Sequence, residues 1–154
     1  MRGALRNLSV LWLVMILSVR GQEVGISVSP VYFTTDKILS LSIHAHFMYP
    51  LSPEVALGLS IERIILEPQH STILMGFKWN FAESAGLIVS AGITREDAER
   101  RTLPSLHFEV VREFKLSRLL HIGPTLEIAY DTNDFHAGIG LHISLDWGNH
   151  HQDH

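Results

Sequence analysis

The sequence contains no cysteine. A disulfide framework and lipid attachment through a cysteine are therefore excluded. The chain after residue 21 also lacks a long apolar run, and no stretch there approaches the roughly 20 residues that a membrane-spanning helix needs. If this part of the chain crosses a membrane, it must use strands, because only helices and closed barrels satisfy the backbone inside lipid.

Positive charge is scarce as well. The chain has 12 basic and 16 acidic residues, and three of the basic residues but none of the acidic ones precede Gln22. The remainder therefore carries nine basic and 16 acidic residues, a net charge of −7 with histidine neutral. Because phosphate binding needs a basic footprint, this balance argues against nucleic acid as a partner.

The two ends of the chain differ from its middle. Residues 1–21 have the pattern of a secretory signal peptide, in which two arginines precede an apolar core at 8–19. That core is too short to span a membrane, and cleavage is predicted after Gly21. Residues 148–154 form a polar, histidine-rich tail. A single domain over 22–147 remains between them.

Apolar and polar residues alternate through this domain. In the clearest run, Phe135–Trp147, every odd position is apolar and every even position is polar or glycine. Successive side chains of a strand point to opposite faces, so each run has one apolar and one polar face. The runs lie at 23–33, 37–48, 54–64, 71–81, 85–93, 104–115, 119–130 and 134–147. We predict eight antiparallel strands joined as up-and-down hairpins, with a densely charged connection at 94–103.

Two barrel architectures share this pattern, and they differ in which face lies inside. A secreted soluble barrel of the lipocalin kind would hold an apolar ligand against an inward apolar face. A membrane barrel would turn that face toward lipid. Glycine, serine and alanine dominate the polar face, whereas a soluble surface would be richer in lysine, glutamate and arginine. Small residues suit the narrow interior of an eight-stranded barrel.

Aromatic residues favour the membrane barrel. They collect on the apolar face at both ends of the predicted strands. One end has Tyr32, Tyr130 and Phe135, and the other has Phe47, Trp79, Phe81, Phe114 and Trp147. Aromatic girdles at both interfaces are typical of membrane barrels. We therefore predict an all-β fold, an eight-stranded antiparallel up-and-down transmembrane β-barrel.

A few residues run against this pattern. Pro30 and Pro124 fall inside strands of a sheet that should have no edges, so we expect a bulge or a shifted boundary there. Arg112 falls on the lipid face near a strand end, where its cost is small. Leu74 and Ile88 are predicted to point into the lumen.

The periodicity and the girdles resemble those of the small eight-stranded outer-membrane β-barrels of Gram-negative bacteria. The resemblance covers residues 22–147 and implies an outer-membrane location, contact with outer-membrane lipid and insertion by the barrel-assembly machinery. Those proteins usually end on an aromatic residue; Trp147 matches it, but residues 148–154 follow. Because a general porin needs about 16 strands, we expect a plugged polar lumen and a structural, adhesion-like or ligand-binding role.

Ionisable residues are predicted to line the lumen. Six are histidines: His44, His46, His107, His121, His136 and His142. Seven more are Glu54, Glu62, Lys78, Glu109, Glu113, Glu127 and Asp146. Pairing Tyr130 with Phe135 in the last hairpin sets Ala129 against His136, with Glu127 on the diagonal.

Five of these residues should form a cluster in one half of the barrel: Glu62, His107, Glu109, Glu127 and His136. Two imidazoles and two carboxylates, those of His107, Glu109, Glu127 and His136, could bind zinc or a similar ion. The alternative is a hydrogen-bonded network that fills the lumen. Because no ligand-spacing motif is present, we expect the network and no cofactor.

Two weaker signals concern other functions. His142 and Ser144 share one face, and a barrel-borne lipid A deacylase uses a similar His-x-Ser pair, which makes an outer-membrane lipid-modifying enzyme an alternative. This chain continues with Leu145-Asp146-Trp147, however, where that family has Asn-Ala-Gly. The tail histidines, His150, His151 and His154, could bind metal weakly, and the charged loop at 95–101 is expected to be solvated.

Overall fold

A computed structural model describes residues 22–98, 100–131 and 134–147 of the chain. The predicted signal peptide at 1–21 and the predicted tail at 148–154 lie outside the described residues. The strands are β1 (Gln22–Phe33), β2 (Ile38–Pro50), β3 (Val55–Ile64), β4 (His70–Ala82), β5 (Ala85–Glu96), β6 (Thr102–Arg112), β7 (Phe114–Lys115), β8 (Leu120–Asp131) and β9 (Phe135–Trp147).

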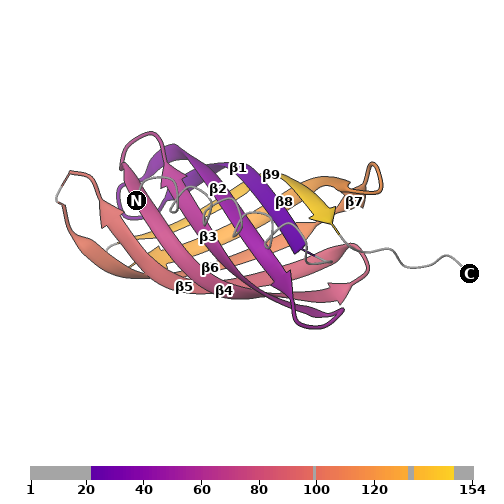
Figure 1. Ribbon diagram of the computed structural model, residues 1–154. Coiled ribbons are helices and arrows are strands. Elements are labelled where there is room, and N and C mark those ends of the chain that lie inside the picture. Colours follow the sequence, from indigo (N-terminus) through magenta and orange to yellow (C-terminus); the bar gives the residue numbers. More distant parts are fainter. Residues whose placement is uncertain (1–21, 99, 132–133, 148–154) are drawn as a thin grey trace, which may run out of the picture.

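These strands form one closed antiparallel sheet. Their order is β6-β5-β4-β3-β2-β1-β9-β8-β7, and β6 also pairs with β8, which closes the sheet into a barrel. Figure 1 shows the strands winding obliquely around a common axis. Within the described parts of the chain, no helix is long and apolar enough to cross a membrane.

β6 and β7 together form the predicted sixth strand. Val111 pairs with Thr125 and Phe114 pairs with Ile122, so both stretches follow β8 in one register. The gap between them lies opposite Pro124, which has no N–H to give to the ladder. It also lies opposite Gly123, where an added side-chain carbon would overlap the carbonyl oxygen of Arg112. The predicted eight-stranded antiparallel barrel is therefore confirmed.

Pro30 interrupts the seam between the first and last strands in the same way. Pairing of β1 with β9 stops at Val28 with Leu141 and resumes at Val31 with Gly138, without a change of register. The expected bulge is thus a short gap in the ladder. The hairpin prediction for β8 and β9 is confirmed, because Tyr130 pairs with Phe135 and Ala129 with His136.

The barrel has a loop end and a turn end. β1, β3, β5 and β8 finish at the loop end, and β2, β4, β6 and β9 finish at the turn end, where the connections at 51–54, 83–84 and 116–119 lie. The charged connection is shorter than the predicted 94–103, because β5 continues to Glu96 and β6 begins at Thr102. β4 begins at His70, one residue before its predicted start, which places one more histidine on the barrel wall.

The apolar face lies outside. Leu59 is 60% exposed and Ile139 is 67% exposed, whereas Ser42 and Glu62 are buried in the lumen. This orientation contradicts the soluble alternative, in which the aliphatic face would line a ligand cavity. Leu74 and Ile88 are buried inside, as predicted.

The aromatic residues predicted as girdles lie near the two ends of the outer surface. Phe47 is half-buried, and the other seven are exposed: Tyr32, Trp79, Phe81, Phe114, Tyr130, Phe135 and Trp147. Arg112 lies at the end of β6 with its guanidinium carbon 5.1 Å from the centre of the Phe114 ring. A cation over an aromatic ring is a favourable contact at this depth.

A lipid-facing belt predicts a cost for charge that depends on depth. Leu59→Arg, halfway along β3, should lower the free energy of unfolding in lipid vesicles by about 2–4 kcal/mol. Leu39→Arg, close to the loop-end girdle on β2, should lower it by only about 0–1 kcal/mol. Denaturant titration of both variants in vesicles checks this. Equal, small effects would show that this face does not contact lipid.

Candidate functional site

The lumen holds the candidate site, and its central group is Glu109 on β6. Its Oε1 accepts hydrogen bonds from Ser27 on β1, at 2.9 Å, and from Thr125 on β8, at 2.8 Å. Its Oε2 lies 3.0 Å from the Nδ1 of His44 on β2. One carboxylate therefore connects four strands across the interior. All four side chains are buried.

Glu62 on β3 is the centre of a second layer, toward the loop end. Ser42 donates a hydrogen bond to its Oε1 at 2.8 Å. The Nε2 of His107 lies 3.5 Å from its Oε2, and the Nε2 of His136 lies 3.6 Å from its Oε1. His70 joins this layer from the start of β4, within 4.8 Å of ligand atoms on Glu62 and His136.

A third layer lies toward the turn end around Lys78. Its ammonium donates to Glu23 at 2.6 Å and to Glu113 at 2.9 Å. Glu23 also lies 3.0 Å from the Nε2 of His46, and Glu113 accepts a hydrogen bond from Ser144 at 2.6 Å. Lys78 is fully buried, so this cation depends on both carboxylates for its compensation.

The structure places all five residues of the predicted cluster in the lumen but divides them between layers. Glu62, His107 and His136 belong to the second layer, and Glu109 to the first. Glu127 is buried beside Gly138, where an added side-chain carbon would lie 3.0 Å from its Oε1. Because Gly138 has no side chain, the carboxylate of Glu127 fits beside it.

The four residues considered as a metal site are not brought together as a ligand set. Among the described residues, two groups of three place ligand atoms within 4.8 Å of one another: Glu62, His70 and His136, and Glu23, His46 and His142. His136 alone comes from the predicted set. Glu109 follows His107 by two residues along β6, so it lies nearer the turn end. There its carboxylate oxygens contact Ser27, His44 and Thr125.

His142 and Ser144 are both buried in the lumen rather than on the lipid face. Ser144 donates to Glu113, and the Nε2 of His142 lies 3.4 Å from the same carboxylate. The Nδ1 of His142 is 3.1 Å from the hydroxyl of Ser27. The pair thus belongs to the third layer, and its position gives no access to a lipid substrate.

Three residues predicted for the lumen lie at its turn end or beyond. Glu54 is exposed in the turn after β2, where its backbone N–H donates to Ser52, so its prediction as a lumen residue is wrong. His121 and Asp146 are half-buried near the ends of β8 and β9.

Sequence reasoning missed Glu23 and His70. Glu23 lies two residues before Gly25, so its parity on β1 was a usable signal for the lumen face. His70 lies one residue before the predicted strand at 71–81 and shortly after the Glu67-Pro68 pair, so the prediction assigned it to neither face. No periodic signal identified it.

Two hollows lie near the loop end. One, of about 260 Å³, is the mouth of the lumen, and His70, Glu96, Asp131 and Asp134 are among the residues that line it. The other, of about 290 Å³, is on the outer wall between Ile43, Ile61 and Ile73.

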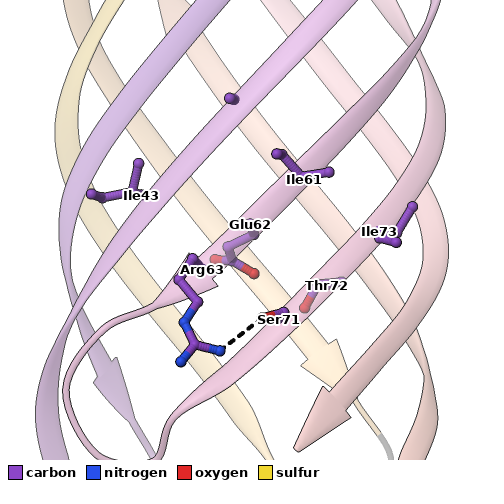
Figure 2. Close-up of a pocket in the computed structure, with 8 residues that line it drawn as sticks. Ile43, Ile61, Glu62, Arg63, Ser71, Thr72 and Ile73 are labelled. Atoms are coloured by element: carbon purple, nitrogen blue, oxygen red, sulfur yellow. Dashed lines mark hydrogen bonds between the residues drawn. The ribbon is translucent and has the colours of Figure 1, made fainter. Parts of the chain in front are cut away.

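Figure 2 shows Arg63 at one edge of the outer-wall hollow, with its guanidinium turned toward Ser71. It donates to the Ser71 hydroxyl and to Asp97, each at 2.7 Å. The hydrogen bond from Arg63 lowers the pKa of the Asp97 carboxyl. Ser71 also pairs with Arg95 on β5, so two arginines flank it on the outer face.

Comparison with known proteins finds the fold but no sequence family. No family model and no curated protein matches the chain. Among solved structures, Neisserial surface protein A (NspA) is similar with a TM-score of 0.62 at 9% identity, over 82% of this chain and 96% of that one.

Two further solved structures cover 82% of this chain. Ail, the attachment invasion locus protein of Yersinia pestis, was solved in complex with the heparin analogue sucrose octasulfate; it has a TM-score of 0.57 at 12% identity and is covered over 99%. The N-terminal β-barrel domain of Pseudomonas aeruginosa OprF has a TM-score of 0.51 at 15% identity and is covered over 100%. The chain therefore has the fold of the small eight-stranded transmembrane β-barrels.

Proposed function

We propose that this protein is an outer-membrane barrel that does not conduct solutes and that presents its loop end for ligand binding or adhesion. The observation that carries the proposal is the orientation of the closed barrel, with an exposed aliphatic belt between two aromatic rims and a buried polar interior. An exposed apolar surface of this extent needs a lipid environment. Insertion by the barrel-assembly machinery belongs to the same proposal.

The lumen is plugged, in this proposal, by the three layers of side chains. The barrel has eight strands, a number at which side chains just fill the interior. The Glu109 layer spans the lumen between β1, β2, β6 and β8, and the Lys78 layer does so near the turn end. Moving ions through would require these hydrogen bonds and ion pairs to break, so solutes do not pass.

The outer-wall hollow supports lipid as a partner. Ile43, Ile61 and Ile73 form an apolar lining of a kind that suits an acyl chain. Arg63 lines its loop-end edge and Arg95 lies beyond Ser71 on the next strand, at the depth where anionic headgroups of the outer leaflet would sit.

The mouth of the lumen offers an acidic lining to ligands. Asp36, Glu67, Glu96, Asp131 and Asp134 line it, together with His70 and Arg101. A surface of this charge attracts cations and repels polyanions. We therefore propose cationic rather than sulfated ligands for this chain, in contrast to the heparin analogue bound by Ail.

Fractionation of cells that express the full chain tests the location. We expect the protein in the outer-membrane fraction, with a gel mobility that changes on boiling because the closed barrel resists detergent until heated. A periplasmic protein whose mobility is unchanged by boiling would refute the membrane proposal. In planar bilayers, the folded protein should show no steady open-channel current.

The Lys78 layer predicts a difference between breaking a charge cluster and removing it. Lys78→Met leaves Glu23 and Glu113 without their cation and should lower the free energy of unfolding by about 3–5 kcal/mol. The triple variant with Glu23→Gln and Glu113→Gln should regain much of this loss, because no buried charge is left uncompensated. Denaturant unfolding in vesicles measures both. A triple variant less stable than Lys78→Met would contradict this account of the plug.

The arginine edge predicts a dependence on lipid charge. The wild-type barrel should unfold at higher denaturant in vesicles that contain anionic phospholipid than in neutral ones, and Arg63→Gln with Arg95→Gln should remove most of that difference. Arg112→Gln, at the turn end, is the matched control. In vesicles whose anionic lipid is confined to the outer leaflet, it should keep the difference. Loss of the difference in Arg112→Gln alone would move the lipid contact to the other rim.

A further inference from the structure

The second layer of the lumen has the composition of a transition-metal site. Glu62 on β3, His70 on β4 and His136 on β9 place three ligand atoms within 4.8 Å of one another. All three side chains are buried. β3 and β4 are neighbours, whereas His136 reaches the group from the last strand, so the barrel and not the local sequence assembles the set.

Several polar atoms of this group lack a hydrogen bond. The Nδ1 of His136 has no hydrogen-bond partner among the described residues, although the residue is only 2% exposed, and its Nε2 has a long, 3.6 Å contact with Glu62. The Oε2 of Glu62 has no hydrogen bond either and lies 3.5 Å from the Nε2 of His107. Buried polar groups are nearly always hydrogen-bonded, so weakly bonded ligand atoms within 4.8 Å of one another have the capacity to bind a shared cation.

Surrounding residues contact all three of these side chains. Ser42 donates to the Oε1 of Glu62 and so orients the carboxylate. The ring of Phe33 lies 4.6 Å from that of His136 and 5.7 Å from that of His70, centre to centre. A hydrogen-bonded carboxylate and an apolar wall are the usual outer shell of a metal centre.

A route from the outside leads to the group. His70 is shared between the three-residue group and the 260 Å³ cavity at the mouth of the lumen. The acidic residues of that cavity raise the local concentration of cations. A metal ion can therefore reach the histidines from the loop end without passing the Glu109 layer.

We propose that Glu62, His70 and His136 bind a divalent cation of the zinc class. Two imidazoles and one carboxylate are a ligand set that zinc accepts, with a fourth position left for water or a ligand in the mouth cavity. Zinc–ligand distances of about 2.0–2.2 Å require the three atoms to approach to roughly 3.4 Å, a shift that side-chain rotation supplies. Calcium and magnesium prefer oxygen ligands and fit less well.

The other three-residue group is a natural comparison. Glu23, His46 and His142 are equally close together, but Glu23 already binds the ammonium of Lys78 at 2.6 Å. The positive charge of Lys78, so close to Glu23, would repel a metal cation bound by the same carboxylate. His142 is engaged further by Ser27, and its ring stacks on that of His46 at 5.1 Å. We expect no zinc at this group.

Calorimetric titration of zinc chloride into the full chain, folded in detergent micelles, tests the proposal. A background variant with His150, His151 and His154 changed to glutamine removes the tail histidines and should still bind one zinc per barrel. In that background, His136→Gln and His70→Gln should each weaken binding about 100-fold, and Ser42→Ala about tenfold. His121→Gln, at the turn end, is the matched control and should bind as the background does.

Cobalt substitution gives an independent readout. Co²⁺ bound by two imidazoles and a carboxylate in a four-coordinate site should give strong visible absorption, which zinc abolishes. The boiling-dependent gel shift shows which variants fold. If His136→Gln does not fold, His70→Gln, at the rim of the lumen, is the variant compared with the background. Zinc binding that disappears with the tail histidines, or that persists unchanged in folded His70→Gln, would overturn the proposal.

Discussion

The structure depends on one constraint, the narrowness of a closed barrel whose outer face is apolar. Eight strands leave an interior that side chains must fill, and backbone closure leaves no room for loops to do so. The partner of an ionisable residue placed inside must therefore come mainly from another strand. Glu109 finds three, on β1, β2 and β8, and Lys78 finds two carboxylates. Backbone hydrogen bonds already join each strand to its neighbours. The polar side chains inside add cross-links between strands on different sides of the lumen.

Strand parity explains why so much of the fold was predictable from sequence. A period of two assigns each residue to a face, and it survives errors of one residue at a strand end. The seam at Pro30 and the gap opposite Pro124 show the same robustness, since both interrupt hydrogen bonds while the register continues. The inward position of Leu74 and Ile88 followed from parity alone, against their apolar character.

The composition of each layer was less predictable, because parity gives a face and a rough height but not the neighbour across the lumen. His107 and Glu109 are neighbours on one face of β6, yet they belong to different layers. His107 contacts Glu62 in the second layer, whereas Glu109 contacts His44 in the first. That division depends on barrel tilt, which no local pattern encodes. His70 was missed for a different reason: the Glu67–Pro68 pair reads as a turn, and the strand begins as soon as that turn ends.

The two ends of the lumen balance charge by different means. Among the buried residues of the described chain, Lys78 is the single lysine or arginine, and it lies toward the turn end beside Glu23 and Glu113. Among the described residues, the ion-pair partners of Glu62, toward the loop end, are imidazoles. The ammonium of Lys78 is compensated by two carboxylates in direct contact, whereas an imidazole is a cation only when protonated and a metal ligand when neutral. The turn end is therefore a fixed seal, and the loop end is the part of the interior whose charge can respond to what the mouth cavity admits.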